Sequence, residues 1–223
     1  HLLPTRDDGH IIRAWVPGCA TGEEAYSLAI LLDERIQDEG GTQDVQIFAT
    51  DLDADAVESA RDGLYPAGIA NDLSGQRLQR YFALEEGVYR VHKKIRDTVV
   101  FAEQNAVSDP PFSRLDLIVC RNLLIYLNGD AQHRLLQLFH YGLRTGGLLF
   151  LVASETITGS EDLFETLDNR HKVMRRRETT RAATIPLGAD RPRSGTGTEP
   201  AAPPHLVAET GSRHLSRAVE RLM

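Results

Sequence analysis

Short apolar runs alternate along the chain with stretches whose apolar residues are spaced three or four apart. The run Ile11–Val16 predicts a buried strand, and Glu23–Gln37 follows it with the spacing of an amphipathic helix. The strand Val45–Thr50 and the helix Ala54–Asp62 repeat this pair, and Gly63 closes the second helix. Alternating strands and helices predict an α/β fold, in which a mostly parallel sheet has helices on both faces.

The second half of the chain resumes this alternation after an interruption. Tyr65–Arg96 breaks the rhythm and is expected to be an insertion on a Rossmann-like core, with a short strand at Val88–Val91. Beyond it we expect strands at Thr98–Phe101 and Leu115–Cys120, a helix from Asn128 or Asp130 to about Leu143 that Gly146–Gly147 ends, a strand at Leu148–Val152, and a last antiparallel strand near His171–Arg175.

Composition divides the chain into three parts. Residues 1–178 carry the strand and helix pattern and are expected to form one domain. Residues 179–204 are rich in proline, glycine, threonine and arginine, which predicts a flexible linker. Residues 205–223 regain weak helical spacing and are expected to start a helix of a following domain. Because the chain begins at His1 rather than at Met, we expect it to be a piece of a longer protein.

Charge, cysteine content and hydropathy narrow the partner classes. The formal net charge of −7 disfavours a nucleic-acid partner, which usually meets a basic face. No apolar run approaches the roughly 20 residues that cross a bilayer, so membrane insertion is not expected. The two cysteines, Cys19 and Cys120, make no disulfide framework, which favours a reducing compartment and a cytoplasmic location.

Polar or glycine residues follow each predicted parallel strand. These segments are Gly18–Glu24, Asp51, Gln104–Ala106 and Arg121–Asn122. Open α/β sheets bind ligands in the crevice outside the carboxyl ends of their strands, so the four segments are expected to converge there. Gly18 lets the backbone approach a ligand closely.

The turn G-C-A-T-G-E-E indicates what kind of ligand fits. A dinucleotide site has three glycines so that a pyrophosphate can sit on the helix N-terminus, whereas here the acids Glu23 and Glu24 follow Gly22. These acids repel a diphosphate and suit a cationic ligand, and Asp51 is placed to accept the hydroxyls of a ribose. The residues therefore favour S-adenosylmethionine, which has a ribose, an ammonium and a sulfonium, over NAD.

Each candidate also has a purely structural interpretation. Glu23 and Glu24 are acids that the dipole of a helix favours in its first turn, Asp51 suits an N-cap, and Asn105 suits a turn. The histidines His133 and His140 have no carboxylate or cysteine at a ligand spacing beside them, so no metal site is predicted.

Five motifs, in order over Ile11 to Arg177, carry a resemblance to a known family. They are W-V-P-G-C-A-T-G-E-E-A-Y-S-L-A, I-F-A-T-D-L-D, V-F-A-E-Q-N-A, D-L-I-V-C-R-N-L-L-I-Y-L and G-G-L-L-F-L-V-A-S-E-T. With them the chain resembles the catalytic domain of the CheR-type chemotaxis receptor methyltransferases, which has a Rossmann-like fold with a small β-subdomain insertion. The segments D-P-P-F-S-R-L-D-L and E-D-L-F-E-T-L-D resemble the subset in which this enzyme is fused to a CheB-type methylesterase.

The resemblance implies transfer of a methyl group from S-adenosylmethionine to glutamate side chains on receptor cytoplasmic helices, with S-adenosylhomocysteine as product. It places Glu23 or Glu24 by the methionine part of the cofactor and Asp51 on the ribose. The insertion corresponds to the β-subdomain, which in some members docks a receptor tail peptide. The remaining assignments are Asn105 and Ala106 beside the adenine, Arg121 and Asn122 facing the sulfonium and the substrate pocket, and Tyr126 near that pocket, with Arg121 and Tyr126 as candidate catalytic residues.

One departure leaves a second function open. The family carries an N-terminal helical domain and a T-x-F-F-R motif, and this chain starts after both. The alternative to the methyltransferase is therefore a non-catalytic module that binds S-adenosylmethionine or docks a partner within a signalling fusion.

Overall fold

A twisted sheet of seven strands organises the computed structural model, which describes residues 10–152 and 160–178. The strand order among these residues is β6-β2-β1-β7-β8-β10-β9. The first five are parallel, and β10 runs antiparallel to both of its neighbours. The strands are β1 (Ile12–Pro17), β2 (Val45–Asp51), β6 (Val99–Glu103), β7 (Leu115–Cys120), β8 (Leu143–Leu151), β9 (Phe164–Asp168) and β10 (Val173–Arg176).

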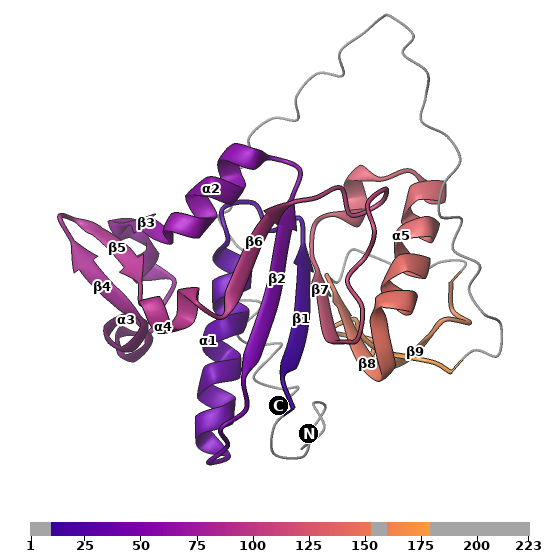
Figure 1. The fold of residues 1–223 in the computed structure, drawn as a ribbon, viewed down its shortest axis with the longest axis horizontal. Coiled ribbons are helices and arrows are strands. Elements are labelled where there is room, and N and C mark those ends of the chain that lie inside the picture. The colour runs from indigo at the N-terminus through magenta and orange to yellow at the C-terminus, as the bar shows by residue number, and fades with distance from the viewer. Residues whose placement is uncertain (1–9, 153–159, 179–223) are drawn as a thin grey trace, which may run out of the picture.

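Helices cover both faces of this sheet (Figure 1). The helices α1 (Glu23–Asp38) and α2 (Ala54–Asp62) lie on one side, and α5 (Gly129–Gly142) lies on the other. Apolar side chains from the strands split accordingly into two buried clusters, one facing each helical layer. The predicted α/β, Rossmann-like fold class is confirmed.

The strand order reverses at the middle of the sheet. From β1 the chain moves outward through β2 to β6, and it then returns to place β7 on the other side of β1. A crevice forms at such a reversal because the connections after the two neighbouring strands leave in opposite directions. The connections after β1 and β7 therefore mark the position for a ligand.

The interruption in the sequence pattern forms a second sheet. Its strand order is β3-β5-β4, and Figure 1 shows it beyond α1, on the side away from α5. Arg77 makes an ion pair with Glu34 of α1, with an Nη2 to Oε2 distance of 2.7 Å, which attaches the insertion to the core. The elements are β3 (Leu64–Pro66), η1 (Ala67–Asn71), α3 (Gly75–Tyr81), β4 (Phe82–Glu85), β5 (Val88–Val91) and α4 (Lys93–Arg96).

The structure corrects the predicted boundary between α5 and β8. The helix ends at Gly142, within one residue of the predicted Leu143, but β8 begins at Leu143 rather than at the predicted Leu148. Leu143 is buried and pairs with Leu115 of β7, so tertiary pairing takes this residue into the strand. Strand β9 was not predicted. The linker at 179–204 and the helix at 205–223 lie outside the described residues and stay predictions.

Among residues 10–152 and 160–178, no helix has both the length and the hydropathy that a bilayer crossing requires.

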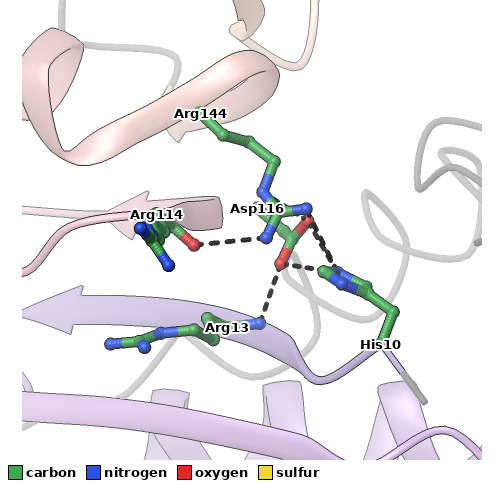
Figure 2. Close-up of polar contacts among 5 residues, drawn as sticks. All are labelled: His10, Arg13, Arg114, Asp116 and Arg144. Atoms are coloured by element: carbon green, nitrogen blue, oxygen red, sulfur yellow. Dashed lines mark hydrogen bonds and ion pairs between the residues drawn. The ribbon is translucent and has the colours of Figure 1, made fainter.

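A buried carboxylate at the start of β7 joins several strand ends (Figure 2). Asp116 is 4% exposed, and its Oδ2 accepts a hydrogen bond of 2.9 Å from the backbone N–H of Arg13 on β1. His10 Nε2 lies 3.3 Å from both carboxylate oxygens, and Arg144 Nε of β8 lies 3.2 Å from Oδ1. The cluster holds β1, β7 and β8 together at their amino ends, opposite the carboxyl ends where the crevice is expected.

His140 gives a testable pH dependence of stability. The residue is 2% exposed, and burial lowers its pKa, although a hydrogen bond of 3.0 Å between Nε2 and the Arg177 carbonyl opposes that shift. The unfolded chain then binds the proton more readily than the folded protein does. The contribution of His140 to stability is therefore present above about pH 6.5 and is lost as the pH falls below it. We expect the urea midpoint to fall between pH 7.5 and 5.5, and His140→Gln to flatten that fall.

The exposed His133, seven residues earlier on α5, supplies the matched control. His133→Gln is expected to leave the pH profile unchanged, because this side chain is exposed to solvent in the folded protein. Equal profiles for wild type and His140→Gln contradict the prediction.

Candidate cofactor site

The turn after β1 is anchored to the end of β2. The backbone N–H groups of Gly18 and Cys19 both donate to the carbonyl of Thr50, at 2.7 and 3.0 Å. Gly18 and Gly22 have φ values of 72° and 89°, a region that favours glycine. A Cβ on Gly22 would lie 2.9 Å from the Ala60 Cβ, so the turn packs directly on α2.

Asp51, the last residue of β2, faces this turn. Its Oδ2 accepts a 2.8 Å hydrogen bond from the N–H of Ala20, and its Oδ1 accepts one of 3.1 Å from Asp53. A carboxylate offers about four acceptor positions, so two remain for the hydroxyls of a ribose. The N-cap of α2 is Asp53, which accepts from Asp55 and Ala56; the N-cap interpretation of Asp51 is therefore wrong.

The two acids that open α1 have different neighbours. Glu23 accepts a hydrogen bond from Thr21 Oγ1 at 2.8 Å. Glu24 faces across the sheet reversal, and its Oε2 lies 3.9 Å from Nη1 of Arg121, which follows β7. The side chains of Glu24 and Arg121 are 20% and 10% exposed. An acid and a base from the two sides of the crevice thus lie together.

The buried thiol of Cys19 lies close to three carboxylates of the site. Burial, together with the smaller effects of the charges on Asp51, Glu24 and Glu23, raises its pKa to about 12 against an opposing backbone hydrogen bond. Three carboxylates therefore act on one point of the turn. A negative field of this kind disfavours a diphosphate and favours a ligand with cationic groups.

Asn105 and Ala106 follow the end of β6 at the same edge. The side-chain oxygen of Asn105 accepts from the N–H groups of Val107 and Ser108, at 3.0 and 3.2 Å. This is the turn role considered as the alternative, and it leaves only the amide N–H₂ of Asn105 for a ligand. Ala106 packs against the apolar cluster on the α5 side. Their assignment to the adenine stays a prediction.

The segment after β7 presents both polar and apolar groups. Asn122 has a φ of 57°, which turns the chain sharply after Arg121. The short helix η2 (Leu124–Tyr126) then buries Leu124 and leaves Ile125 and Tyr126 54% and 62% exposed. Arg121 and Asn122 follow β7, and Gly18–Glu24 follows β1. Both segments therefore begin at the carboxyl ends of the strands, where the crevice is expected. The catalytic roles of Arg121 and Tyr126 stay predictions.

Sequence reasoning missed three contributors to this site. Ala20 supplies the N–H that orients Asp51, and Leu52, the next residue along the chain, is 65% exposed. Tyr65, from the insertion, donates a 2.9 Å hydrogen bond to the carbonyl of Thr21. Leu52 could have been predicted from the sequence, because it is an apolar residue directly after Asp51. The Tyr65 contact spans 44 residues, and nothing in the sequence indicates it.

Residues 2–173 match the family model described as "CheR methyltransferase, SAM binding domain". The chain belongs to this family. The family assignment predicted from the motifs is thereby confirmed, and so is S-adenosylmethionine as the cofactor of the domain.

Curated relatives agree with this membership. The chain is 41% identical over 216 residues to an uncharacterised 104.1 kDa protein of Rhodobacter capsulatus, a match that covers 94% of the chain and 22% of that protein. It is 35% identical over 159 residues to a chemotaxis protein methyltransferase of Listeria monocytogenes, covering 71% of the chain and 59% of that protein. The chain thus spans about a fifth of the first relative and about three fifths of the second.

A solved structure, PKMT2 from Rickettsia typhi in complex with AdoHcy, matches with a TM-score of 0.40 and 16% identity, over 63% of this chain and 20% of that one.

Proposed function

We propose that this CheR-family domain transfers a methyl group from S-adenosylmethionine to glutamate side chains of chemoreceptor cytoplasmic helices. One observation carries the proposal: acidic Glu24 and basic Arg121 face each other across the sheet reversal, beside Asp51 at the end of β2. The ligand suited to this set has a ribose, cationic groups and no phosphate. Membership of the CheR family supports the substrate class.

The residues of the turn fit the parts of such a cofactor. Asp51 has acceptor positions left for two ribose hydroxyls, and Leu52 offers an apolar surface next to it. Glu23 and Glu24 suit the ammonium of the methionine part. S-adenosylmethionine supplies a methyl group on a positively charged sulfonium, and its transfer removes that charge together with the negative charge of the acceptor glutamate.

The chain's own task in this reaction is alignment. A carboxylate is already a nucleophile at neutral pH, so the acceptor needs no general base; the site must hold its oxygen in line and exclude water. Arg121 is the cation placed to hold the incoming carboxylate. The ion pair with Glu24 partly offsets the positive charge of Arg121. This keeps Arg121 from binding the substrate carboxylate too tightly in the ground state.

Further partners follow from the same proposal. The three-stranded insertion is the expected position for a receptor tail peptide, and the protein is expected to work in the cytoplasm. The match to a fifth of a 104.1 kDa relative supports the idea that the domain belongs to a larger fusion, one with a CheB-type methylesterase being the version that the motifs favour. The non-catalytic binding module remains the second candidate, favoured by the 62% exposure of Tyr126, which leaves one candidate catalytic side chain open to water.

Methyl transfer separates the two candidates. The chain is incubated with methyl-labelled S-adenosylmethionine and a receptor cytoplasmic fragment, and the label is followed into the fragment. We expect label that mild base releases as methanol, as carboxyl esters do, and none in a fragment whose glutamates are replaced by glutamine. Binding of S-adenosylhomocysteine without any labelling favours the non-catalytic module. Base-stable label contradicts a glutamate acceptor.

A further inference from the structure

We propose that Tyr65, on the first strand of the insertion, is a positioning residue for the cofactor-binding turn. The proposal rests on the proposed function, because it takes the turn after β1 as the cofactor site. It assigns the insertion a role inside the domain: the insertion fixes the backbone that precedes Glu23 and Glu24.

The contact is buried and directional. The Tyr65 hydroxyl donates to the carbonyl of Thr21 at 2.9 Å, and the residue is 6% exposed. Burial and the nearby charge of Glu23 raise the pKa of Tyr65 well above its ordinary value of 10, so the hydroxyl keeps its proton and stays a donor.

This hydrogen bond fixes one peptide plane from both ends. The carbonyl of Thr21 and the N–H of Gly22 belong to the same planar peptide group, and the Gly22 N–H donates to the Cys19 carbonyl at 2.9 Å. The Tyr65 hydroxyl binds the oxygen of this peptide and the Cys19 carbonyl binds its N–H. Rotation of the plane would break both hydrogen bonds. It lies between Ala20, which orients Asp51, and Glu23, which opens α1.

The turn needs an external anchor because its own residues are permissive. Gly22 must be glycine, with its φ of 89° and Ala60 2.9 Å from a would-be Cβ, and glycine has the most backbone freedom to lose. Tyr65 itself is held in place, since β3 pairs it with Tyr89 of β5 and its ring packs at a right angle to that of Tyr26, with the ring centroids 6.1 Å apart. The second sheet therefore supplies the stiffness that the glycines lack.

Tyr26 provides a matched control for this contact. Its hydroxyl is also buried and also donates to a backbone carbonyl, that of Ala60 on α2, at 2.8 Å. Tyr65→Phe and Tyr26→Phe remove the same group from equally buried rings. Of the two hydroxyls, only that of Tyr65 bonds to the turn. Tyr26 meets the turn through its backbone N–H, which donates to the Gly22 carbonyl at 3.0 Å and which Tyr26→Phe leaves in place.

The experiment compares these two variants with the wild-type chain. Calorimetry gives the Kd for S-adenosylhomocysteine, NMR gives the hydrogen-exchange rate of the Gly22 amide, and urea gives the unfolding midpoint. We expect similar small losses of midpoint in both variants. Tyr65→Phe is expected to raise the Kd about five- to tenfold and to speed Gly22 exchange, in line with the loss of one buried hydrogen bond, while Tyr26→Phe changes the Kd less than twofold.

The outcomes separate the two proposals. A wild-type chain that does not bind S-adenosylhomocysteine overturns the cofactor site and this inference with it. Normal binding by the wild type with an unchanged Kd in Tyr65→Phe overturns the positioning role alone. Equal rises in Kd for both variants also overturn it, because they show a general effect of lost stability.

Discussion

Replacement of Asp51 by alanine is expected to weaken S-adenosylhomocysteine binding by about a hundredfold or more. The variant loses two acceptor positions for ribose hydroxyls, and hydrogen bonds to a charged group contribute about 1.5 to 3 kcal/mol each. It also frees the N–H of Ala20, which the carboxylate holds at 2.8 Å, so the turn loses one of its hydrogen bonds to β2. Calorimetry on the folded variant measures the change.

Asp53, two residues later, is the control for this prediction. Its carboxylate caps α2 through Asp55 and Ala56, so Asp53→Ala is expected to reduce the free energy of unfolding by about 1 kcal/mol and to leave the Kd nearly unchanged. Asp51→Asn should fall between wild type and Asp51→Ala, because one amide oxygen still accepts from Ala20. A Kd in Asp51→Ala within threefold of wild type contradicts the assignment.

Local signals in the sequence were sufficient for much of the fold. Strand β7 and helix α2 have the predicted bounds, because a continuous apolar run defines the first and the cap Asp53 with Gly63, at a φ of 61°, defines the second. The start of β8 at Leu143 rather than at Leu148 could not be predicted, because Leu143 joins the strand through pairing with the distant Leu115. Within residues 10–152 and 160–178, strand β9 pairs only with β10, and its alternation of F-E-T-L-D is too short to stand out.

For the site too, local signals were enough for part of the prediction, and long-range contacts were not predicted. Parallel strands end at one edge of a sheet, so the sequence placed Asp51, Arg121 and the acidic turn together before any contact was known. What it lacked were contacts made by common side chains over long separations. Tyr65 reaches Thr21 across 44 residues, and no periodicity encodes which carbonyl a tyrosine hydroxyl meets. Asn105 was ambiguous for a different reason, since the same side chain suits a turn and a ligand.

The largest expected loss of stability comes from Asp116. We expect Asp116→Ala to reduce the free energy of unfolding by about 3 kcal/mol. The loss leaves the N–H of Arg13 without its 2.9 Å partner, which costs about 1 to 3 kcal/mol when such a group is buried, and it leaves Arg144 beside His10 without the shared carboxylate (Figure 2). Urea unfolding at neutral pH measures the change.

One further variant divides this cost into its causes, and a second serves as a control at an exposed ion pair. Asp116→Asn keeps an oxygen for the Arg13 N–H and removes only the charge, so it is expected to lose less than Asp116→Ala. Asp97→Asn breaks the exposed ion pair with Lys93, whose side chains are 59% and 78% exposed, and should change stability by about 0.5 kcal/mol or less. A loss below 1 kcal/mol in Asp116→Ala contradicts the idea that this cluster holds the strands.

The position of Asp116 also separates stability from binding. Asp116 and Arg121 lie near opposite ends of β7, five residues apart, which is about 17 Å along an extended strand. The loss of the Asp116 contacts at the start of β7 is therefore expected to change the crevice only when the whole sheet unfolds. Below its unfolding transition, Asp116→Ala is expected to keep the wild-type Kd for S-adenosylhomocysteine, whereas Asp51→Ala is expected to lose binding while its stability stays close to that of the wild type.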